Sequence, residues 1–126
     1  MTRIEIRVEV HPTESVEKVK RAVDNVLGEL DLKQVERGDV TMLECDLDGI
    51  ESLCHLREML RRMRIRDAAR ALLTRSAHGD VLAFGLNRQA AYAGRTSFYT
   101  PIEVPLGPIR ITIKGDVDGV IRYLCE

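Results

Sequence analysis

Aromatic residues and cysteines are scarce in this chain of 126 residues. Only 4% of the residues are aromatic, and tryptophan is absent. The cysteines Cys45, Cys54 and Cys125 are odd in number and form no CxxC spacing, which argues against a disulfide framework and against a zinc knuckle. Each of them lies among apolar neighbours in the sequence, so all three are predicted to be small buried hydrophobic residues.

Long apolar stretches are also missing. The longest one, Val81 to Leu86, is far shorter than the roughly 20 residues of a membrane-spanning helix. The N-terminal segment MTRIEIRVEV alternates charged with apolar residues, so it lacks the apolar core of a signal peptide. We therefore expect a cytoplasmic protein that does not enter a membrane.

The sequence contains no catalytic or metal-binding motif that these patterns can identify. The histidines His11, His55 and His78 are too scattered for a ligand set, and the acidic string at residues 46–49 lacks the spacing of a calcium loop. The glycines form neither a Walker motif nor GxGxxG, and GxSxG is absent. We expect no metal, no cofactor and no catalytic residue, although the sequence leaves open whether the protein is an enzyme.

The charge is almost balanced overall but uneven along the chain. The net charge of −1 comes from 19 Lys and Arg against 20 Asp and Glu. Residues 1–56 carry −6 and residues 57–126 carry +5, and most of the positive excess lies in residues 57–75, where seven arginines face two acidic residues. This pattern has two explanations: a surface that binds phosphate groups, or a helix face whose charge is neutralised by the acidic first half of the chain.

Hydrophobic periodicity predicts a single α+β domain over residues 1–126. Its sheet is expected to be mostly antiparallel, or mixed, and backed by helices on one face. Strands are predicted over residues 4–10, 33–36, 40–46, 81–86 and 108–114, and helices over residues 16–27, 50–63, 65–76 and 117–124.

Two connections are less clear from the pattern. The apolar stripes of residues 50–63 and 65–76 fit one kinked helix or two helices, and we favour two helices with a tight junction at Met63–Ile65. Residues 87–96 are predicted to form a short helical turn or a loop. Pro101, Pro105 and Pro108 mark a further loop.

The arginines of residues 57–75 recur at helical spacing, which would align several of them on one helix face. A guanidinium group binds phosphate through two parallel hydrogen bonds and also stacks on nucleic-acid bases. Five of these arginines are therefore predicted to contact RNA phosphates: Arg57, Arg61, Arg64, Arg66 and Arg70.

A second candidate site is the polar segment of residues 87–95. It combines two cations, two amides and one aromatic ring, which are the groups that read single-stranded RNA. Its predicted base or sugar contacts are Asn87, Arg88, Gln89, Tyr92 and Arg95. Tyr92 fits a packed core residue equally well, because the chain has so few aromatic residues.

Three blocks of the sequence resemble a family of small archaeal proteins described as RNA-binding. They are LREMLRRMRIRDAARALL (Leu56–Leu73), LNRQAAYAGRTSF (Leu86–Phe98) and PLGPIRITIKGD (Pro105–Asp116). The resemblance implies a fold similar to that of the large-subunit ribosomal protein that contacts 5S rRNA, with RNA as the partner. It implies no catalytic residues.

These observations predict an RNA-binding protein without catalytic activity, and two alternatives stay open. One is a small-molecule or anion-binding protein, or an enzyme, with a pocket around Arg88 and Arg95. The other is a homodimer that buries the helical face of residues 50–76, because arginine is also common at protein interfaces.

Overall fold

A six-stranded antiparallel sheet forms the base of the fold. The computed structural model describes residues 2–99 and 107–126. Within these residues the strand order is β2-β3-β1-β6-β5-β4. The strands are β1 (Arg3–Val10), β2 (Lys33–Arg37), β3 (Val40–Asp48), β4 (Ala77–His78), β5 (Val81–Leu86) and β6 (Ile109–Lys114). The predicted α+β class is confirmed, and every strand pairing described is antiparallel.

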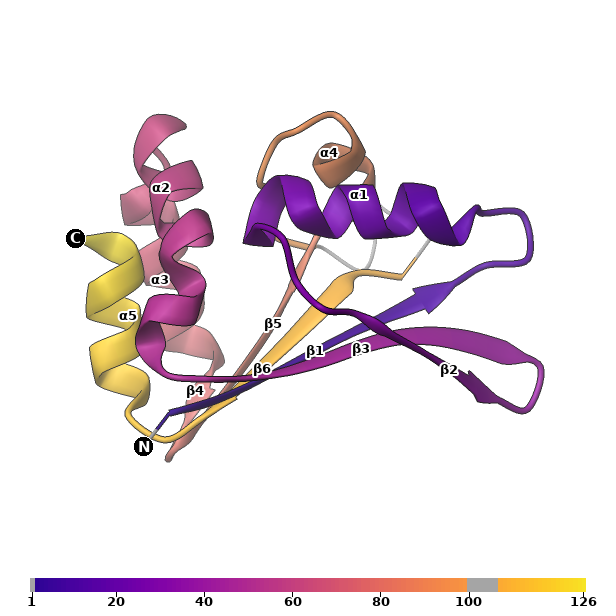
Figure 1. Cartoon of the computed structure of the whole chain (residues 1–126). Helices are drawn as coiled ribbons and strands as arrows, with labels where there is room; N and C mark the ends of the chain where they lie inside the picture. The colour runs from indigo at the N-terminus through magenta and orange to yellow at the C-terminus, as the bar shows by residue number, and fades with distance from the viewer. Residues whose placement is uncertain (1, 100–106) are drawn as a thin grey trace.

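The helices cover one face of this sheet (Figure 1). They are α1 (Val16–Leu27), α2 (Cys54–Arg62), α3 (Arg66–Ser76), α4 (Arg88–Tyr92) and α5 (Val117–Cys125), and a short 3-10 helix, η1 (Ile50–Leu53), precedes α2. α1 crosses the strands and contacts α4, whereas α2, α3 and α5 form a group beside it.

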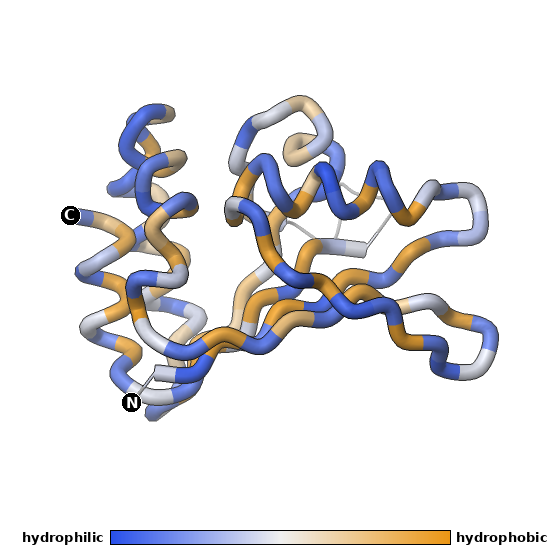
Figure 2. Tube along the Cα trace, viewed as in Figure 1, coloured by the Kyte–Doolittle hydropathy of each residue, from blue (hydrophilic) through white to orange (hydrophobic). Residues whose placement is uncertain are grey.

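The alternation of residues in β1 explains why only one face of the sheet is covered. Ile4, Ile6 and Val8 are completely buried beneath the helices, while the charged residues between them point to the opposite face. Figure 2 shows the same alternation of orange and blue along the strands. The burial of the apolar face drives the association of sheet and helices.

Most predicted elements are confirmed, with local differences. The predicted helix 50–63 begins as the 3-10 helix η1 and becomes α-helical only from Cys54. β3 extends to Asp48, and His78 belongs to the two-residue strand β4 rather than to a turn. Of the predicted proline loop, Pro108 lies within the described residues, whereas Pro101 and Pro105 lie outside them.

The junction between α2 and α3 confirms that the arginine-rich segment forms two helices. The N–H of Ile65 donates to the carbonyl of Leu60 (3.2 Å) and the N–H of Arg64 donates to that of Arg61 (3.2 Å). This is the hydrogen-bond pattern of a Schellman motif, in which the residue after the C-cap takes a left-handed conformation. Arg64 occupies this position with φ = 58°, where glycine is usual.

The cysteines differ in their environments, which corrects the prediction that all three are buried. Cys45 and Cys125 are buried, and burial raises the pKa of both thiols. Cys54 is exposed because it lies on the solvent side of the first turn of α2.

Candidate nucleic-acid interface

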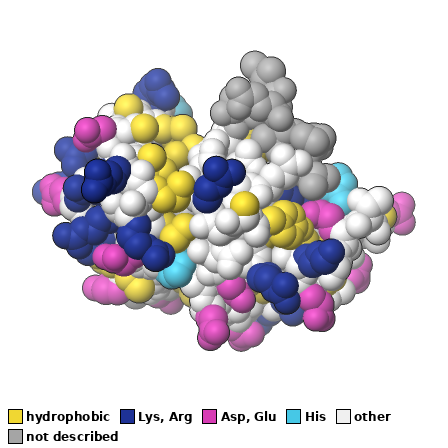
Figure 3. Space-filling model, turned by 90° about the horizontal axis from the view of Figure 1, so that it is seen from above, with side chains coloured by type: hydrophobic (Ala, Val, Ile, Leu, Met, Phe, Trp, Pro, Cys, Tyr) yellow, Lys and Arg dark blue, Asp and Glu magenta, His cyan; other side chains and the backbone are white. Residues whose placement is uncertain are grey.

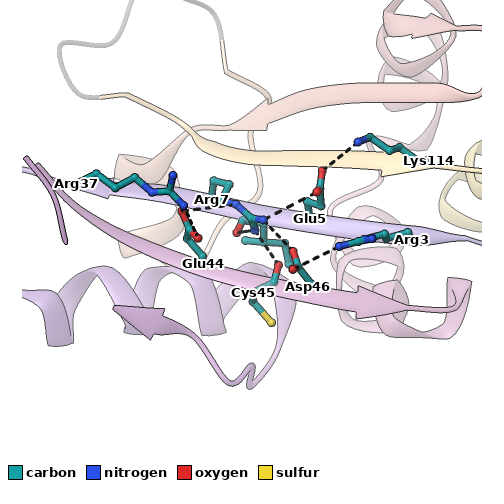
Figure 4. Close-up of polar contacts among 9 residues, drawn as sticks. Arg3, Glu5, Arg7, Arg37, Glu44, Cys45, Asp46 and Lys114 are labelled. Carbon is teal, nitrogen blue, oxygen red and sulfur yellow. Dashed lines mark hydrogen bonds and ion pairs between the residues drawn. The ribbon is translucent and has the colours of Figure 1, made fainter. Parts of the chain in front are cut away.

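Several acidic residues of the first half of the chain lie on the open face of the sheet. There Arg7 of β1 lies 2.9 Å from Asp46 and 3.7 Å from Glu44, both on β3 (Figure 4). Further ion pairs on this face involve Arg3, Glu5, Arg37 and Lys114. Among the described residues, no acidic residue of positions 1–56 pairs with an arginine of positions 57–75. Within the described residues, the arginines of positions 57–75 are therefore not neutralised by ion pairs with the acidic first half, whereas Glu5 and Glu14 of that half pair with Lys114 and Arg88.

Three of the predicted phosphate contacts lie together at the α2–α3 junction. Arg61, Arg64 and Arg66, which we call the arginine cluster, line a surface depression of about 380 Å³ together with Asp67. Arg61 also lies 3.7 Å from Glu58 in the previous turn of α2, but both side chains are more than half exposed. An exposed pair of this kind is weak, so it leaves Arg61 available to a ligand.

Figure 3 shows basic side chains gathered over one side of the upper face, with a band of hydrophobic side chains beside them. This upper face is the one that carries the turn between α2 and α3 and the segment around α4 (Figure 1). Basic side chains therefore gather on this upper face, in addition to the basic residues that form ion pairs on the open sheet face.

Arg57 and Arg70 do not extend the arginine cluster, because they stabilise the end of α5. The Nε of Arg57 donates to the Tyr123 carbonyl (2.8 Å), and its guanidinium lies 5.0 Å from the centre of the Tyr123 ring. Arg70 donates to the carbonyl of Cys125 (3.0 Å). The last carbonyls of a helix lack intrahelical partners and attract cations. These contacts give both arginines a structural role, and the phosphate contacts predicted for them remain a prediction.

The predicted stripe of Arg57, Arg61 and Arg64 on one helix face is also not formed. α2 ends at Arg62, so Arg64 lies beyond the helix in the left-handed turn. The spacing of these residues fits one continuous helix, but the helix ends before Arg64, so the three side chains do not share a helix face. Arg61 and Arg64 nevertheless line the same depression.

Arg88 is buried, with an exposure of 1%, and this burial excludes the RNA contact predicted for it in the described conformation. Its guanidinium forms an ion pair with Glu14 and donates to the carbonyl of Gly107 (2.7 Å). The hydroxyl of Tyr92 donates to the other carboxylate oxygen of Glu14 (2.9 Å). Arg88 and Tyr92 thus tie α4 to the loop before α1, and although the Tyr92 ring remains 38% exposed, its hydroxyl is occupied.

The carboxylate of Glu14 is held in its charged form. Burial by itself raises the pKa of Glu14, but hydrogen bonds from the His11 backbone, Tyr92 and Arg88 outweigh this effect, so the pKa is lower than usual. Burial, together with the hydrogen bond to this carboxylate, raises the pKa of Tyr92 to about 12. The cluster is therefore a charged structural contact at neutral pH.

A second concave surface, which we call the α4 pocket, lies between α4 and the α2–α3 junction. Its volume is about 490 Å³, within the range of small-molecule sites. It is lined by Met63, Asn87, Gln89, Ala90, Arg95, Thr96 and Ser97. Met63 directly precedes Arg64, so the linings of the α4 pocket and the arginine cluster meet at this point of the backbone.

The lining of the α4 pocket includes both predicted and unpredicted residues. Asn87, Gln89 and Arg95 were predicted, although the side-chain oxygen of Asn87 also caps α4 by accepting from Ala90 N (3.1 Å). Thr96, Ser97 and Met63 were not, since nothing in the local pattern shows that the N–H of Thr96 reaches the sulfur of Met63 (3.2 Å).

The alternative pocket around both Arg88 and Arg95 does not form. Arg95 is exposed at the α4 pocket, whereas Arg88 points toward Glu14. Residues 2–99 and 107–126 also bring together no group of three His, Cys, Asp or Glu side chains that could hold a metal ion. None of the helices in these ranges is both long enough and apolar enough to cross a membrane.

Comparison with known proteins identifies relatives over almost the whole chain. A curated UPF0201 protein of Metallosphaera sedula is 40% identical over 126 residues, which cover 98% of this chain and 87% of the relative. A UPF0201 protein of Thermococcus onnurineus is 39% identical, covering 96% and 89% of the two chains. The crystal structure of the UPF0201 protein from Methanococcus jannaschii superimposes with a TM-score of 0.86 at 29% identity, covering 98% of this chain and 99% of that one.

A family model described as RNA binding matches residues 3–115. That range includes every strand of the sheet, the arginine cluster and the α4 pocket. The resemblance noted in the sequence is confirmed at the level of the family, whereas the likeness to the 5S-rRNA-binding ribosomal protein remains a prediction. On the extent of the match and of the shared fold, the chain belongs to the RNA-binding family that its model describes, together with the archaeal UPF0201 proteins.

Proposed function

We propose that this protein binds RNA without catalysing a reaction, with the arginine cluster holding phosphate groups. The observation that carries the proposal is the separation of charges: acids of the first half pair on the open sheet face, while Arg61, Arg64 and Arg66 line a separate surface depression. Phosphate is the ligand that several adjacent guanidinium groups bind best. The family description agrees with this partner.

The proposal also predicts how binding depends on salt. A protein that neutralises phosphates releases the cations condensed on the nucleic acid, so its affinity falls as the salt concentration rises. On single-stranded RNA, the slope of log K against log salt concentration is about −0.7 for each phosphate contact. Three lost contacts should therefore make the slope shallower by about 2.

The test is a fluorescence-anisotropy titration of a labelled single-stranded RNA at several salt concentrations. The variant Arg61→Ala/Arg64→Ala/Arg66→Ala should bind much more weakly and show the shallower slope. Arg110→Ala is the matched control, because Arg110 is exposed on β6 in the sheet and outside the arginine cluster. Wild-type protein that does not bind at low salt, or a triple variant that binds like wild type, would contradict the proposal.

The homodimer alternative predicts a different behaviour of the variant Arg61→Ala in sedimentation velocity experiments. If the helical face of residues 50–76 is an interface between two copies, Arg61→Ala should dissociate the dimer in sedimentation velocity experiments. If Arg61 instead contacts RNA, the sedimentation coefficient of the free protein should not change.

A further inference from the structure

We propose that the α4 pocket binds one unpaired nucleotide of the RNA, whose neighbouring phosphates lie on the arginine cluster. This inference rests on the proposed function and adds to it the kind of RNA that the site selects. It follows from the unused hydrogen-bonding groups of the pocket, the mixture of side chains in its wall, and its position beside Arg64.

Within the described part of the chain, Thr96 carries a buried hydrogen-bonding group without a partner at the wall of the α4 pocket. Its side chain is only 2% exposed, and its hydroxyl group has no hydrogen-bond partner among the described residues. Its backbone N–H reaches only the sulfur of Met63, which is a weak acceptor. Buried polar groups in folded proteins almost always have a partner. The hydroxyl oxygen has almost no accessible surface, so a ligand in the α4 pocket would become its partner as the pocket wall adjusts around that ligand.

The wall of the α4 pocket offers side chains that suit a nucleic-acid base. Gln89 presents an amide group that can donate and accept, as the edge of a base requires, and Asn87, whose oxygen caps α4, adds the two donors of its amide nitrogen. The planar guanidinium of Arg95 can stack on the face of a base, and the polarisable sulfur of Met63 packs well against aromatic rings. Among the residues that the structure describes, no aromatic side chain lines this pocket, so the flat contact with the base falls to Arg95 and Met63.

The α4 pocket and the arginine cluster are joined through consecutive residues of the chain. Met63 in the pocket wall and Arg64 in the arginine cluster are adjacent residues, so a nucleotide in the pocket has guanidinium groups beside its phosphates. A base inside an A-form duplex is stacked and paired, and its edge cannot enter a concave site. A base in a single strand, a bulge or a loop can turn out of the chain and enter it. The pocket therefore selects unpaired RNA, whereas the arginine cluster alone would bind any RNA.

The experiment compares two RNAs of the same sequence, one as a labelled 12-nucleotide single strand and one as a blunt duplex. Wild-type protein should bind the single strand more tightly. Thr96→Val preserves the shape of the side chain and removes the hydroxyl group, so we expect a three- to tenfold loss of affinity for the single strand and no change for the duplex. Gln89→Ala should act in the same direction, which keeps the proposal testable if Thr96→Val folds poorly.

Two controls separate a lost contact from a damaged fold. Thr112→Val makes the same chemical change on β6, away from the α4 pocket, and should leave both affinities unchanged. The urea midpoint of Thr96→Val should be equal to that of wild type or higher, because the variant removes an unpartnered buried hydroxyl group.

The possible outcomes distinguish this inference from the proposed function. If wild-type protein binds both RNAs equally, or if Thr96→Val and Gln89→Ala leave single-strand binding unchanged, the pocket does not take a nucleotide, although the arginine cluster can still bind RNA. If neither RNA binds at low salt, both proposals are wrong. A preference for the single strand that both pocket variants abolish, with duplex binding intact, supports the pocket.

Discussion

Arg64 is the residue at which stability and binding are expected to conflict. A non-glycine residue in the left-handed conformation lowers the stability of the folded state by about 1–2 kcal/mol. Glycine lacks this strain, but it loses about 0.5–1 kcal/mol more backbone conformational entropy on folding. We therefore expect Arg64→Gly to raise the free energy of unfolding by up to about 1 kcal/mol and to weaken RNA binding about five- to tenfold. Urea denaturation and anisotropy titrations measure the two effects.

Arg64→Ala is the control for this prediction, because alanine keeps the strained conformation and lacks the guanidinium group. It should weaken RNA binding as much as Arg64→Gly does, without the gain in stability. A glycine variant that is no more stable than the alanine variant would show that the conformation of Arg64 carries no strain.

Glu14 is expected to make the stability of the fold depend on pH. Its pKa in the folded protein is below the usual value of 4.5, so its charged form stabilises the fold above that pH, and this contribution is lost as the pH falls through the folded-state pKa. Glu14→Gln leaves the buried Arg88 without its ion pair and should cost about 3 kcal/mol at neutral pH.

Urea denaturation at neutral pH and at several values below 4.5 measures this effect. The difference between wild type and Glu14→Gln should shrink as the solution becomes more acidic, because the wild-type carboxylate becomes protonated. A difference that stays constant over this range would contradict the role assigned to Glu14.

At the scale of elements, the two kinds of arginine in residues 57–75 should respond differently to substitution. Arg57→Ala and Arg70→Ala remove cations from the end of α5, and each should lower the free energy of unfolding by about 1–2 kcal/mol. Arg61→Ala removes only an exposed ion pair and should change it by less than about 0.5 kcal/mol.

Thermal or urea denaturation of the three single variants, combined with RNA titrations, measures both properties. Arg61→Ala should affect binding more than stability, and Arg57→Ala should affect stability more than binding. Equal losses of stability in all three variants would remove the distinction between structural and binding arginines.

The elements themselves could be predicted well from the sequence, because their signals are local. The alternation in residues 4–10 and the apolar stripe of residues 16–27 each depend on neighbours within two turns or two strand steps. The last helix is likewise capped by a local contact, since Asp116 accepts from the N–H of Gly119 (3.1 Å). The 3-10 start at Ile50 and the left-handed Arg64 carry no comparable local signal.

At the scale of the whole molecule, the candidate site could be predicted only in part. The polar segment 87–95 does border a pocket, but Arg88 does not line it. Arg88 instead forms an ion pair with Glu14, which lies 74 residues earlier in the chain. Thr96 meets Met63 across 33 residues. Contacts between residues so distant in sequence arise from tertiary packing, and the local periodicity of the sequence does not predict them. The same holds for the acids that pair on the sheet instead of on the arginine cluster.

The central position of β1 has a consequence for how the chain folds. Ile6 lies opposite Cys45 on one side and opposite Ile111, about a hundred residues later, on the other. Closing so long a loop costs entropy before the contacts it creates can compensate, which slows folding. The β2–β3 hairpin and its pairing with β1 can form early, whereas β6 joins the sheet only once the chain is available as far as Lys114. Until then one edge of β1 remains open, so the sheet cannot be completed before β6 has been synthesised.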